Sequence, residues 1–338
     1  MIGHRMPECS VLLEHVQEKI KQVFYTKQPV FITASSGTSL QEAAIRNCTD
    51  QKVLNCVNGA FADRWRRVTE ANGKRNEILE VEWGKPILPE PVFKKLGEGG
   101  FDAVTLVHNE TSTGVISPIN EIAKGIRSLP WGEDILILVD SVSGIGGAEL
   151  KFDEWDLDVV LTSSQKALAL PPGLAFCAVS DTALEKARNV QNRGYYLDFL
   201  QLEKYHHRNQ TPFTPAISLI FALDLQLTRI LEEGLTNRFE RHLMLRNATI
   251  SWAHEQGFTL FAEEQFESPT VSCINNNLQI DIDDLNSYLR SQGMIISNGY
   301  GLLKGKNFRI AHMGDLSEDE LDGLLNAITE FMTNEIRA

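Results

Sequence analysis

The chain of 338 residues carries 32 basic and 45 acidic side chains, which gives a formal net charge of -13. This length is enough for one large and one smaller domain, and the negative charge disfavours non-specific contact with nucleic acid or an anionic membrane, so we expect neither as a partner. The N-terminal "MIGHRMPECS" lacks the apolar core of a signal peptide, and no stretch approaches the roughly 18 apolar residues of a membrane span, which predicts a cytoplasmic protein.

Short apolar runs alternate with amphipathic segments over the first half of the chain. Residues 10–24 have apolar side chains at helical spacing, and residues 29–33 are typical of a strand. Further strands are predicted at 52–57, 77–81, 102–107, 135–140, 157–163 and 174–179, most of them separated by helical stretches such as 59–73 and 118–129. Near-continuous apolar strands between helices predict an α/β fold, in which a mostly parallel seven-stranded sheet is flanked by helices.

The last third of the chain has a different pattern. Residues 215–256 are helical in character, and the final hundred residues mix short strands at 270–275 and 308–312 with helices at 282–292 and 317–332. This mixture predicts a smaller α+β domain. We expect a large domain with an N-terminal helix over residues 1–235 and a small C-terminal domain over residues 236–338.

Polar residues follow three of the predicted strands, at the sheet edge where parallel sheets bind ligands. The turn "ASSGTS" at 34–39 leads into a helix and presents amides and hydroxyls to a phosphate, although it could equally be a simple helix cap. Asp140 ends the strand 135–140, where a carboxylate in apolar surroundings needs a partner unless it caps the next turn. Lys166 follows the strand 157–163, beside a Pro-Pro-Gly break.

Two other motifs in this region are incomplete. The glycines from Gly144 onward resemble a dinucleotide-binding fingerprint, but Glu149 stands where the third glycine should be. Ser163 and Lys166 match the Ser-x-x-Lys motif of penicillin-recognising serine hydrolases, but the chain has neither Ser-Asp-Asn nor Lys-Thr-Gly. Neither motif predicts the function.

One cofactor would use the turn, the aspartate and the lysine together. Pyridoxal 5'-phosphate needs a phosphate site, a carboxylate that keeps its ring nitrogen protonated, and a lysine amine that holds its aldehyde as a Schiff base. Partial burial beside a cationic ring favours the deprotonated amine that this lysine must reach during turnover. The sequence therefore predicts pyridoxal 5'-phosphate on Lys166.

The chain resembles the class V, fold type I pyridoxal-phosphate aminotransferases, and within them the alanine/serine–glyoxylate (serine–pyruvate) branch. The resemblance covers nearly the whole chain and rests on motifs in family order and spacing: "SSGTSLQEAAIRN", "NGAFADRW", "HNETSTGVISPI", "LVDSVSGIGG", "SSQKALALPPG", "TPFTPAIS" and "GYGLLKGKNFRIAHMGD". It implies a cytosolic homodimer with shared active sites. Such an enzyme moves the amino group of a small L-amino acid, such as alanine or serine, to a small 2-oxo acid, such as glyoxylate or pyruvate.

The resemblance also implies roles for individual residues. Lys166 would hold the cofactor and act as general base and acid, and Arg309 would receive the α-carboxylate of the substrate. Thr211 or Thr214, between which the sequence does not decide, would approach the phosphate of the neighbouring subunit. The remaining cofactor contacts would be Ser36, Gly37, Thr38 and Gln165 at the phosphate, and Phe61, Thr111, Asp140 and Val142 at the ring. Taken alone, Phe61 could be a core residue and Arg309 a surface residue.

Two alternatives stay open beside the aminotransferase. A related lyase such as a cysteine desulfurase needs a mobile cysteine near the small-domain side of the pocket, and Cys273 lies in a predicted strand instead. A cofactor-binding but inactive paralogue is the other alternative, because family members usually begin several tens of residues earlier, with a Gly-Pro-rich segment that lines the substrate pocket. We expect no metal site, since the five cysteines are scattered and no third ligand follows His206 and His207.

Overall fold

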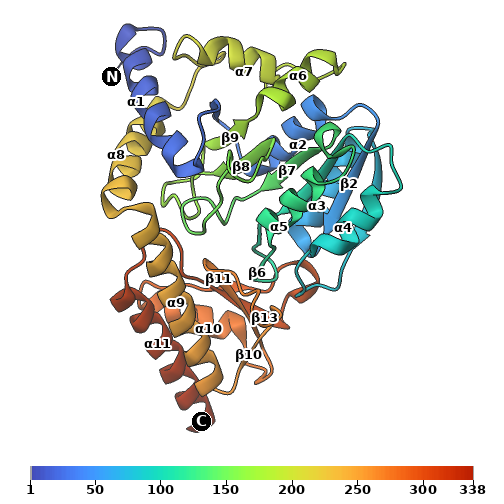
Figure 1. Ribbon diagram of the computed structural model, residues 1–338. Helices are drawn as coiled ribbons and strands as arrows, with labels where there is room; N and C mark the ends of the chain where they lie inside the picture. Colours follow the sequence, from blue (N-terminus) through green and yellow to red (C-terminus); the bar gives the residue numbers. More distant parts are fainter. Residues whose placement is uncertain (1, 338) are drawn as a thin grey trace.

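The structure is a computed structural model that describes residues 2–337, and the side chains of residues 2–333. Two β-sheets organise it: the larger has an apolar core on each face, and the smaller has one core of its own. Figure 1 shows the larger sheet with its helices in the upper part of the molecule and the smaller sheet below it. Among the described residues, no helix combines the length and the apolar character that a membrane crossing requires.

The larger sheet has seven strands in the order β1-β9-β8-β7-β4-β2-β3. Strand β9 runs antiparallel to both of its neighbours, and the other neighbouring pairs are parallel. The strands are β1 (Val30–Thr33), β2 (Lys52–Val57), β3 (Arg75–Glu80), β4 (Ala103–Val107), β7 (Leu136–Asp140), β8 (Val159–Ser163) and β9 (Ala175–Val179). The prediction of a mostly parallel seven-stranded sheet is confirmed.

Helices cover both faces of this sheet because its strand residues alternate between two cores. In β7, for example, Ile137 and Val139 face one core, and Leu136 and Leu138 face the other. The first core is closed by α1 (Pro7–Phe24), α4 (Pro89–Leu96), α5 (Ile119–Arg127) and α8 (Ile217–Glu233). The second is closed by α2 (Gly37–Cys48), α3 (Ala60–Ala71), α6 (Asp181–Asn189) and α7 (Phe199–His206). A short hairpin, β5 (Asn109–Glu110) and β6 (Val115–Ile116), follows β4.

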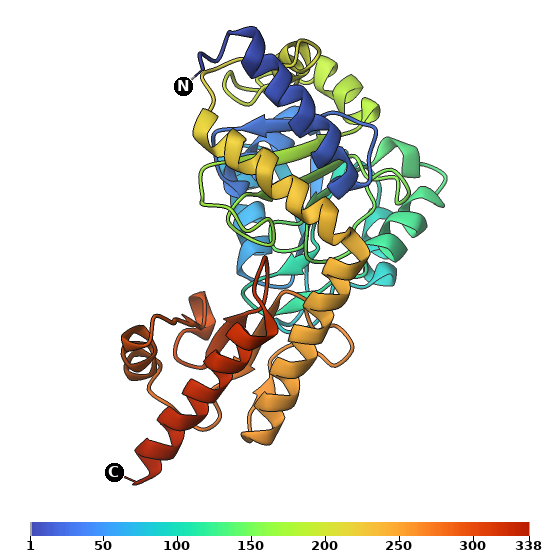
Figure 2. The ribbon, with the colours of Figure 1, turned by 90° about the vertical axis from the view of Figure 1, so that its left-hand side faces the viewer.

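The smaller sheet is antiparallel, with the order β10-β11-β13-β12. Its strands are β10 (Thr259–Leu260), β11 (Val271–Asn275), β12 (Ser297–Asn298) and β13 (Asn307–Ala311), and its helices are α9 (Leu235–Glu255), α10 (Ile282–Ser291) and α11 (Glu318–Arg337). Figure 2 shows α9 and α11 side by side, extending away from the larger sheet.

The two parts meet at Gly234, which separates α8 from α9. Its φ of 82° lies in the left-handed region that glycine adopts without a steric penalty. Helix α8 packs into the core of the larger sheet, and α9 packs into that of the smaller one. The predicted division of the chain after residue 235 falls next to this glycine and stays a prediction.

Candidate active site

A cavity of about 200 Å³ lies at the carboxyl ends of β4, β7 and β8. This is the sheet edge at which the sequence predicts a ligand site. Apart from Thr211, Thr214 and Arg309, every predicted site residue lines the cavity. Its lining comprises Ser36, Gly37, Thr38, Gln41, Phe61, Arg64, Val107, Asn109, Thr111, Asp140, Val142, Ser163, Gln165 and Lys166.

The N-terminus of α2 forms one wall of the cavity. Ser36 caps the helix in a capping box with Ser39, in which each side chain accepts from the backbone of the other residue. Within the described part of the chain, the backbone amides of Gly37 and Thr38 donate to no protein acceptor. A Cβ atom on Gly37 would lie 2.6 Å from Cγ2 of Val142, so only glycine fits there. The helix start therefore offers free N–H groups and a positive dipole end to an anion.

Asp140 is a buried carboxylate held by two donors. Gln41 Nε2 donates to Oδ2 over 2.7 Å, and the backbone amide of Val142 donates to Oδ1 over 2.9 Å. Burial raises the pKa of Asp140, and these two hydrogen bonds, together with the charges of Arg64 and Lys166, act in the opposite direction. The carboxylate is thus fixed in orientation at the end of β7, with one side toward the cavity.

Lys166 reaches the cavity from the loop after β8. Burial lowers the pKa of its amine, the Arg309 guanidinium lowers it further, and Asp140 acts in the opposite direction. No carboxylate of the described residues lies within ion-pair distance of its amine. Nearby, the Ser163 hydroxyl is buried and has no hydrogen-bond partner among those residues. The amine of Lys166 therefore loses its proton more readily than the amine of an exposed lysine.

Arg309 lies beside this cavity on β13 of the smaller sheet. Its guanidinium donates to the carbonyl oxygens of Asn298 and Thr111, each at 3.2 Å, and lies 5.7 Å from the centre of the Tyr300 ring. All of these partners are neutral. Burial lowers the pKa of Arg309, and its hydrogen-bond acceptors carry no negative charge that would compensate the desolvated guanidinium. The contact with Thr111 joins the smaller sheet to the rim of the cavity.

Tyr300 connects the two sides of the cavity mouth. Its ring stacks on Phe61 with centroids 5.3 Å apart, and its hydroxyl accepts from Arg64 over 2.8 Å. Arg64 also lies 4.7 Å from the Phe61 ring centre and donates to the Thr38 hydroxyl over 3.2 Å. Phe61 is thus placed in the mouth of the cavity, between large-domain and small-domain groups.

Thr211 and Thr214 lie apart from the cavity of their own chain. They line a separate small cavity whose other walls include Ile32, Leu174 and Tyr196. The Thr211 hydroxyl donates to a carbonyl two residues away, and Thr214 is exposed. The structure of one chain therefore does not bring either threonine to the predicted cofactor site.

Sequence reasoning missed several of these residues. Gln41 follows Gly37 by one helical turn on α2, and this i, i+4 spacing could have identified it as a neighbour of the same site. Tyr300 lies between two glycines shortly before Arg309, a spacing that suggests a close backbone turn. Arg64 lies three residues after Phe61 on α3 and shares its face. Each of these signals is weak alone.

Glu110 is a buried carboxylate with a different environment. It accepts hydrogen bonds from the backbone amides of Phe61 and Ala62, and from both the amide and the hydroxyl of Ser112. Burial raises its pKa, and these donors oppose that rise. Glu110 therefore anchors the start of α3, and with it the position of Phe61.

The histidines and cysteines near these motifs are packed into the interior. His108 contacts the Ser141 hydroxyl, and His312 lies between Ser272 and the carbonyl of Pro269. Burial lowers their pKa values to about 4 and about 3. The five cysteines are free and buried, and the described residues contain no group of three or more His, Cys, Asp or Glu that could hold a metal.

Comparison with known proteins gives consistent matches over nearly the whole chain. The model of the aminotransferase class-V family matches residues 1–304. An uncharacterised aminotransferase of Methanocaldococcus jannaschii is 39% identical over 327 residues, which cover 95% of this chain and 84% of that protein. The serine–glyoxylate aminotransferase of Methylorubrum extorquens is 33% identical over 336 residues, which cover 95% of this chain and 83% of that protein.

A solved structure agrees with these matches. The alanine–glyoxylate aminotransferase of Nostoc sp. superposes with a TM-score of 0.91 at 28% identity, over 98% of this chain and 89% of that one. The predicted family is therefore confirmed, and the protein belongs to the class V aminotransferases.

Proposed function

We propose that the protein binds pyridoxal 5'-phosphate through Lys166 and moves the amino group of a small L-amino acid, such as alanine or serine, to a small 2-oxo acid, such as glyoxylate or pyruvate. One observation carries the proposal. A lysine amine with a lowered pKa, a buried aspartate and an open helix N-terminus line a single cavity.

The residues of this cavity fit the cofactor. The backbone amides of Gly37 and Thr38 donate to no acceptor of the described residues, so they are free to donate to phosphate oxygens. The unpartnered Ser163 hydroxyl is a further polar group that a ligand would satisfy. Ser36 and Gln165 line the same cavity. We assign these residues to the phosphate.

The other cavity residues would orient and support the ring. Asp140 would hold the proton of the ring nitrogen, and Thr111 would hydrogen-bond the phenolic oxygen, while Phe61 and Val142 would cover the two faces of the ring. When bound, the cofactor supplies a protonated ring that accepts the electron pair released at the substrate's Cα. As general base, Lys166 Nζ would take the proton from this Cα, and as general acid it would deliver the proton to the C4′ position of the cofactor.

Arg309 would determine where an α-amino acid lies. A guanidinium that donates only to neutral carbonyls can still form a charge-assisted pair with a carboxylate. Tyr300, Phe61 and Arg64 narrow the mouth of the cavity, which favours a small side chain. The names of the two glyoxylate aminotransferases above, for serine and for alanine, support donors and an acceptor of this size.

We also propose that the working unit is a homodimer and that its location is cytoplasmic. An apolar surface lies next to the "TPFTP" segment, where Tyr195 is 78% exposed and Tyr196 stacks on Phe213 at 4.8 Å. Exposed aromatic groups of this kind are typical of a protein interface. A second copy on this surface would place Thr211 or Thr214 near the phosphate site of its partner.

The lyase alternative has less support. Cys273 is buried, its thiol contacts the carbonyl of Ser112, and burial raises its pKa to about 12. A desulfurase of the kind considered needs a mobile, reactive thiolate. An inactive paralogue would bind the cofactor in the same way, so only an activity assay distinguishes it from the proposed aminotransferase.

Reduction with borohydride tests the proposal directly. The purified protein should show the visible absorbance of a lysine-bound cofactor, and peptide mapping after reduction should locate the cofactor on Lys166. Lys166→Ala should abolish the trapped cofactor, and Lys304→Ala, at an exposed position of the small domain, should not. A reduced cofactor on another lysine would refute the assignment.

Activity and assembly need separate assays. Amino donors should be screened against glyoxylate and pyruvate, with L-alanine and L-serine among them. A protein that holds the cofactor but transaminates no donor would be the inactive paralogue. A fully active monomer, found by sedimentation at the assay concentration, would refute the shared active site.

A further inference from the structure

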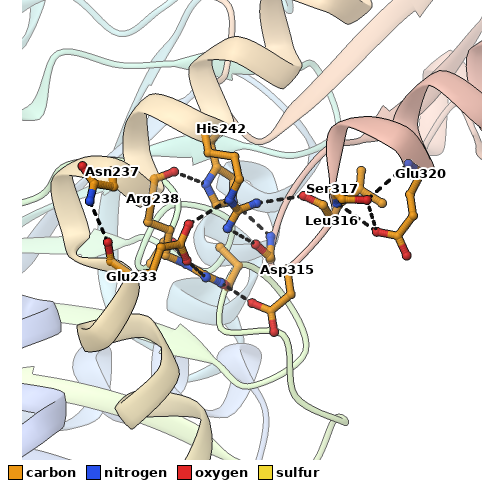
Figure 3. Close-up of polar contacts among 12 residues, drawn as sticks. Glu233, Asn237, Arg238, His242, Asp315, Leu316, Ser317 and Glu320 are labelled. Carbon is orange, nitrogen blue, oxygen red and sulfur yellow. Dashed lines mark hydrogen bonds and ion pairs between the residues drawn. The ribbon is translucent and has the colours of Figure 1, made fainter.

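We propose that Arg238 is a positioning residue that holds the loop of Lys166 in place and links it to the small-domain loop that follows Arg309. This inference rests on the proposed function for its catalytic consequence, although the contacts themselves do not depend on it. Arg238 lies near the start of α9, does not line the cavity, and has only 1% of its surface exposed. Figure 3 shows Arg238 together with Glu233, His242 and Asp315.

Two carboxylates fix the guanidinium in this buried position. Nη1 pairs with Glu233 over 2.6 Å, and Nη2 pairs with Asp315 over 2.9 Å. Glu233 ends α8, and Asp315 lies in the loop between β13 and α11. A buried guanidinium needs such partners, because an unpaired charge in the interior is strongly destabilising. Arg238 therefore has one defined orientation.

In that orientation the remaining donors hold two segments of the active site. Nε donates to the carbonyl of Gly146 over 2.9 Å, in the turn that follows Asp140. Nη2 donates to the carbonyl of Ala167 over 2.9 Å, directly next to Lys166. One side chain thus contacts the loops that carry the predicted ring partner and the predicted cofactor lysine. The acceptor Ala167 directly follows Lys166 in the chain, and Gly146 lies in the turn between Asp140 and the next strand.

The small-domain loop packs against the same place. A Cβ atom on Gly314 would lie 3.1 Å from Cβ of Ala169 and 3.6 Å from the carbonyl oxygen of Lys166, so the two loops touch. His242, one turn after Arg238, accepts from the Gly314 amide through Nε2 and donates to the Arg238 carbonyl through Nδ1. Burial lowers its pKa to about 4, in agreement with the neutral ring that these two bonds require.

This arrangement gives Arg238 a role that its neighbour Arg241 does not have. Arg241 also pairs with Glu233 and donates to the carbonyls of Gly314 and Leu316, but it contacts neither Gly146 nor Ala167. Both arginines therefore join α9 to the small-domain loop, and Arg238 alone of the two extends this connection to Lys166. The pair provides a matched comparison within one helix.

Arg238→Lys tests the role, with Arg241→Lys as its control. A lysine keeps the charge but cannot reach all four acceptors. In the cofactor-free protein, hydrogen exchange at the Ala169 and Leu170 amides, which donate to Lys166 and Ser164, should become about 10-fold faster in Arg238→Lys and stay within about twofold of wild type in Arg241→Lys. Equal exchange in the two folded variants would overturn the proposal.

Kinetics of the holoenzyme provide the second measurement. Displacement of the lysine should lower kcat about 10- to 100-fold with little change in KM, because the groups that bind the substrate remain. Arg241→Lys should leave both constants near their wild-type values. A loss of kcat that is equal in the two variants would mean that Arg238 only stabilises the fold.

Two other results of these experiments call for a different measurement. If Arg238→Lys does not fold, Asp315→Asn tests the proposal in its place. This substitution removes one ion pair of Arg238 by changing the exposed side chain of Asp315. It should speed exchange at Ala169 severalfold relative to Asp319→Asn on α11, and unchanged exchange would overturn the proposal. If wild type lacks transaminase activity, the proposed function fails, and the exchange data alone decide the positioning role.

Discussion

Replacing Arg309 by leucine should weaken the binding of α-amino acids while the cofactor stays bound. The guanidinium makes three contacts with carbonyl oxygens, all at 3.2 Å, and none with a carboxylate among the side chains that the structure describes. A substrate carboxylate would add charge-assisted bonds in a half-buried setting. Such bonds are worth about 1.5 to 3 kcal/mol, which corresponds to a loss of affinity of about 10- to 150-fold.

Part of the effect of Arg309→Leu comes from lost hydrogen bonds within the protein, and this part has to be separated from the effect on substrate binding. Leucine leaves the carbonyls of Asn298 and Thr111 without this donor, and this should cost about 1 kcal/mol of stability. Arg309→Lys keeps the positive charge without the planar fork, so it should recover part of the affinity. Arg290→Leu, on the exposed side of α10, changes the same net charge away from the cavity and serves as the control.

The assay is a titration of the cofactor's visible spectrum with L-alanine and with L-serine. Wild type and Arg290→Leu should respond at similar concentrations, and Arg309→Leu should need about 10- to 150-fold more amino acid, as derived above. The absorbance before titration should be unchanged. If Arg309→Leu binds both amino acids as wild type does, Arg309 does not receive the substrate carboxylate.

Four further predictions follow from the same site. Asp140→Asn should lower the transamination rate about 100-fold, and wild-type turnover in this variant would mean that Asp140 only caps its turn. Glu110→Gln should instead lower the free energy of unfolding in urea by about 1–3 kcal/mol, because an amide NH₂ would face the donors around it. Gly37→Ala should destabilise the cofactor-free protein by about 1–3 kcal/mol through the contact with Val142, and Val142→Ala should restore part of this loss in a double-mutant cycle. Competitive acylation of the cofactor-free protein should find Lys166 deprotonating below the pH of exposed lysines; Asp140→Asn should lower that pKa further, and Arg309→Leu should raise it, so shifts of the opposite sign would contradict the charge assignment.

The periodicity of apolar residues was sufficient to predict the strands of the larger sheet. Six of these strands are short, mostly buried runs, because both sheet faces are covered, whereas the edge strand β3 is exposed or half-buried along its length. The chemistry-bearing residues follow the carboxyl ends of the strands. The direction of β9 was not predictable in this way, since an apolar run has the same pattern in a parallel and an antiparallel pairing. Most of the site residues that could be predicted from the sequence therefore lie at strand ends and in the turns that follow them.

The sequence pattern did not indicate those residues whose hydrogen-bond partners are distant in the chain. Arg238 occurs in a segment with several other arginines, and its sequence pattern is that of an exposed helix. Its acceptors Gly146 and Ala167 are 92 and 71 residues away, and Asp315 is 77 residues away. Only the packing of the two parts brings these groups together. Tyr300 and Arg64 meet for the same reason.

The contrast between the two buried carboxylates explains why Asp140, and not Glu110, is suited to chemistry. Both have a pKa raised by burial, so burial alone does not separate them. Glu110 accepts four hydrogen bonds from three neighbouring residues, which leaves little capacity for a ligand. Asp140 accepts only two, lines the cavity, and is influenced by the positive charges of Arg64 and Lys166. A cationic ring nitrogen placed against Asp140 would compensate its buried charge, whereas the hydrogen bonds of Glu110 are already complete without any ligand.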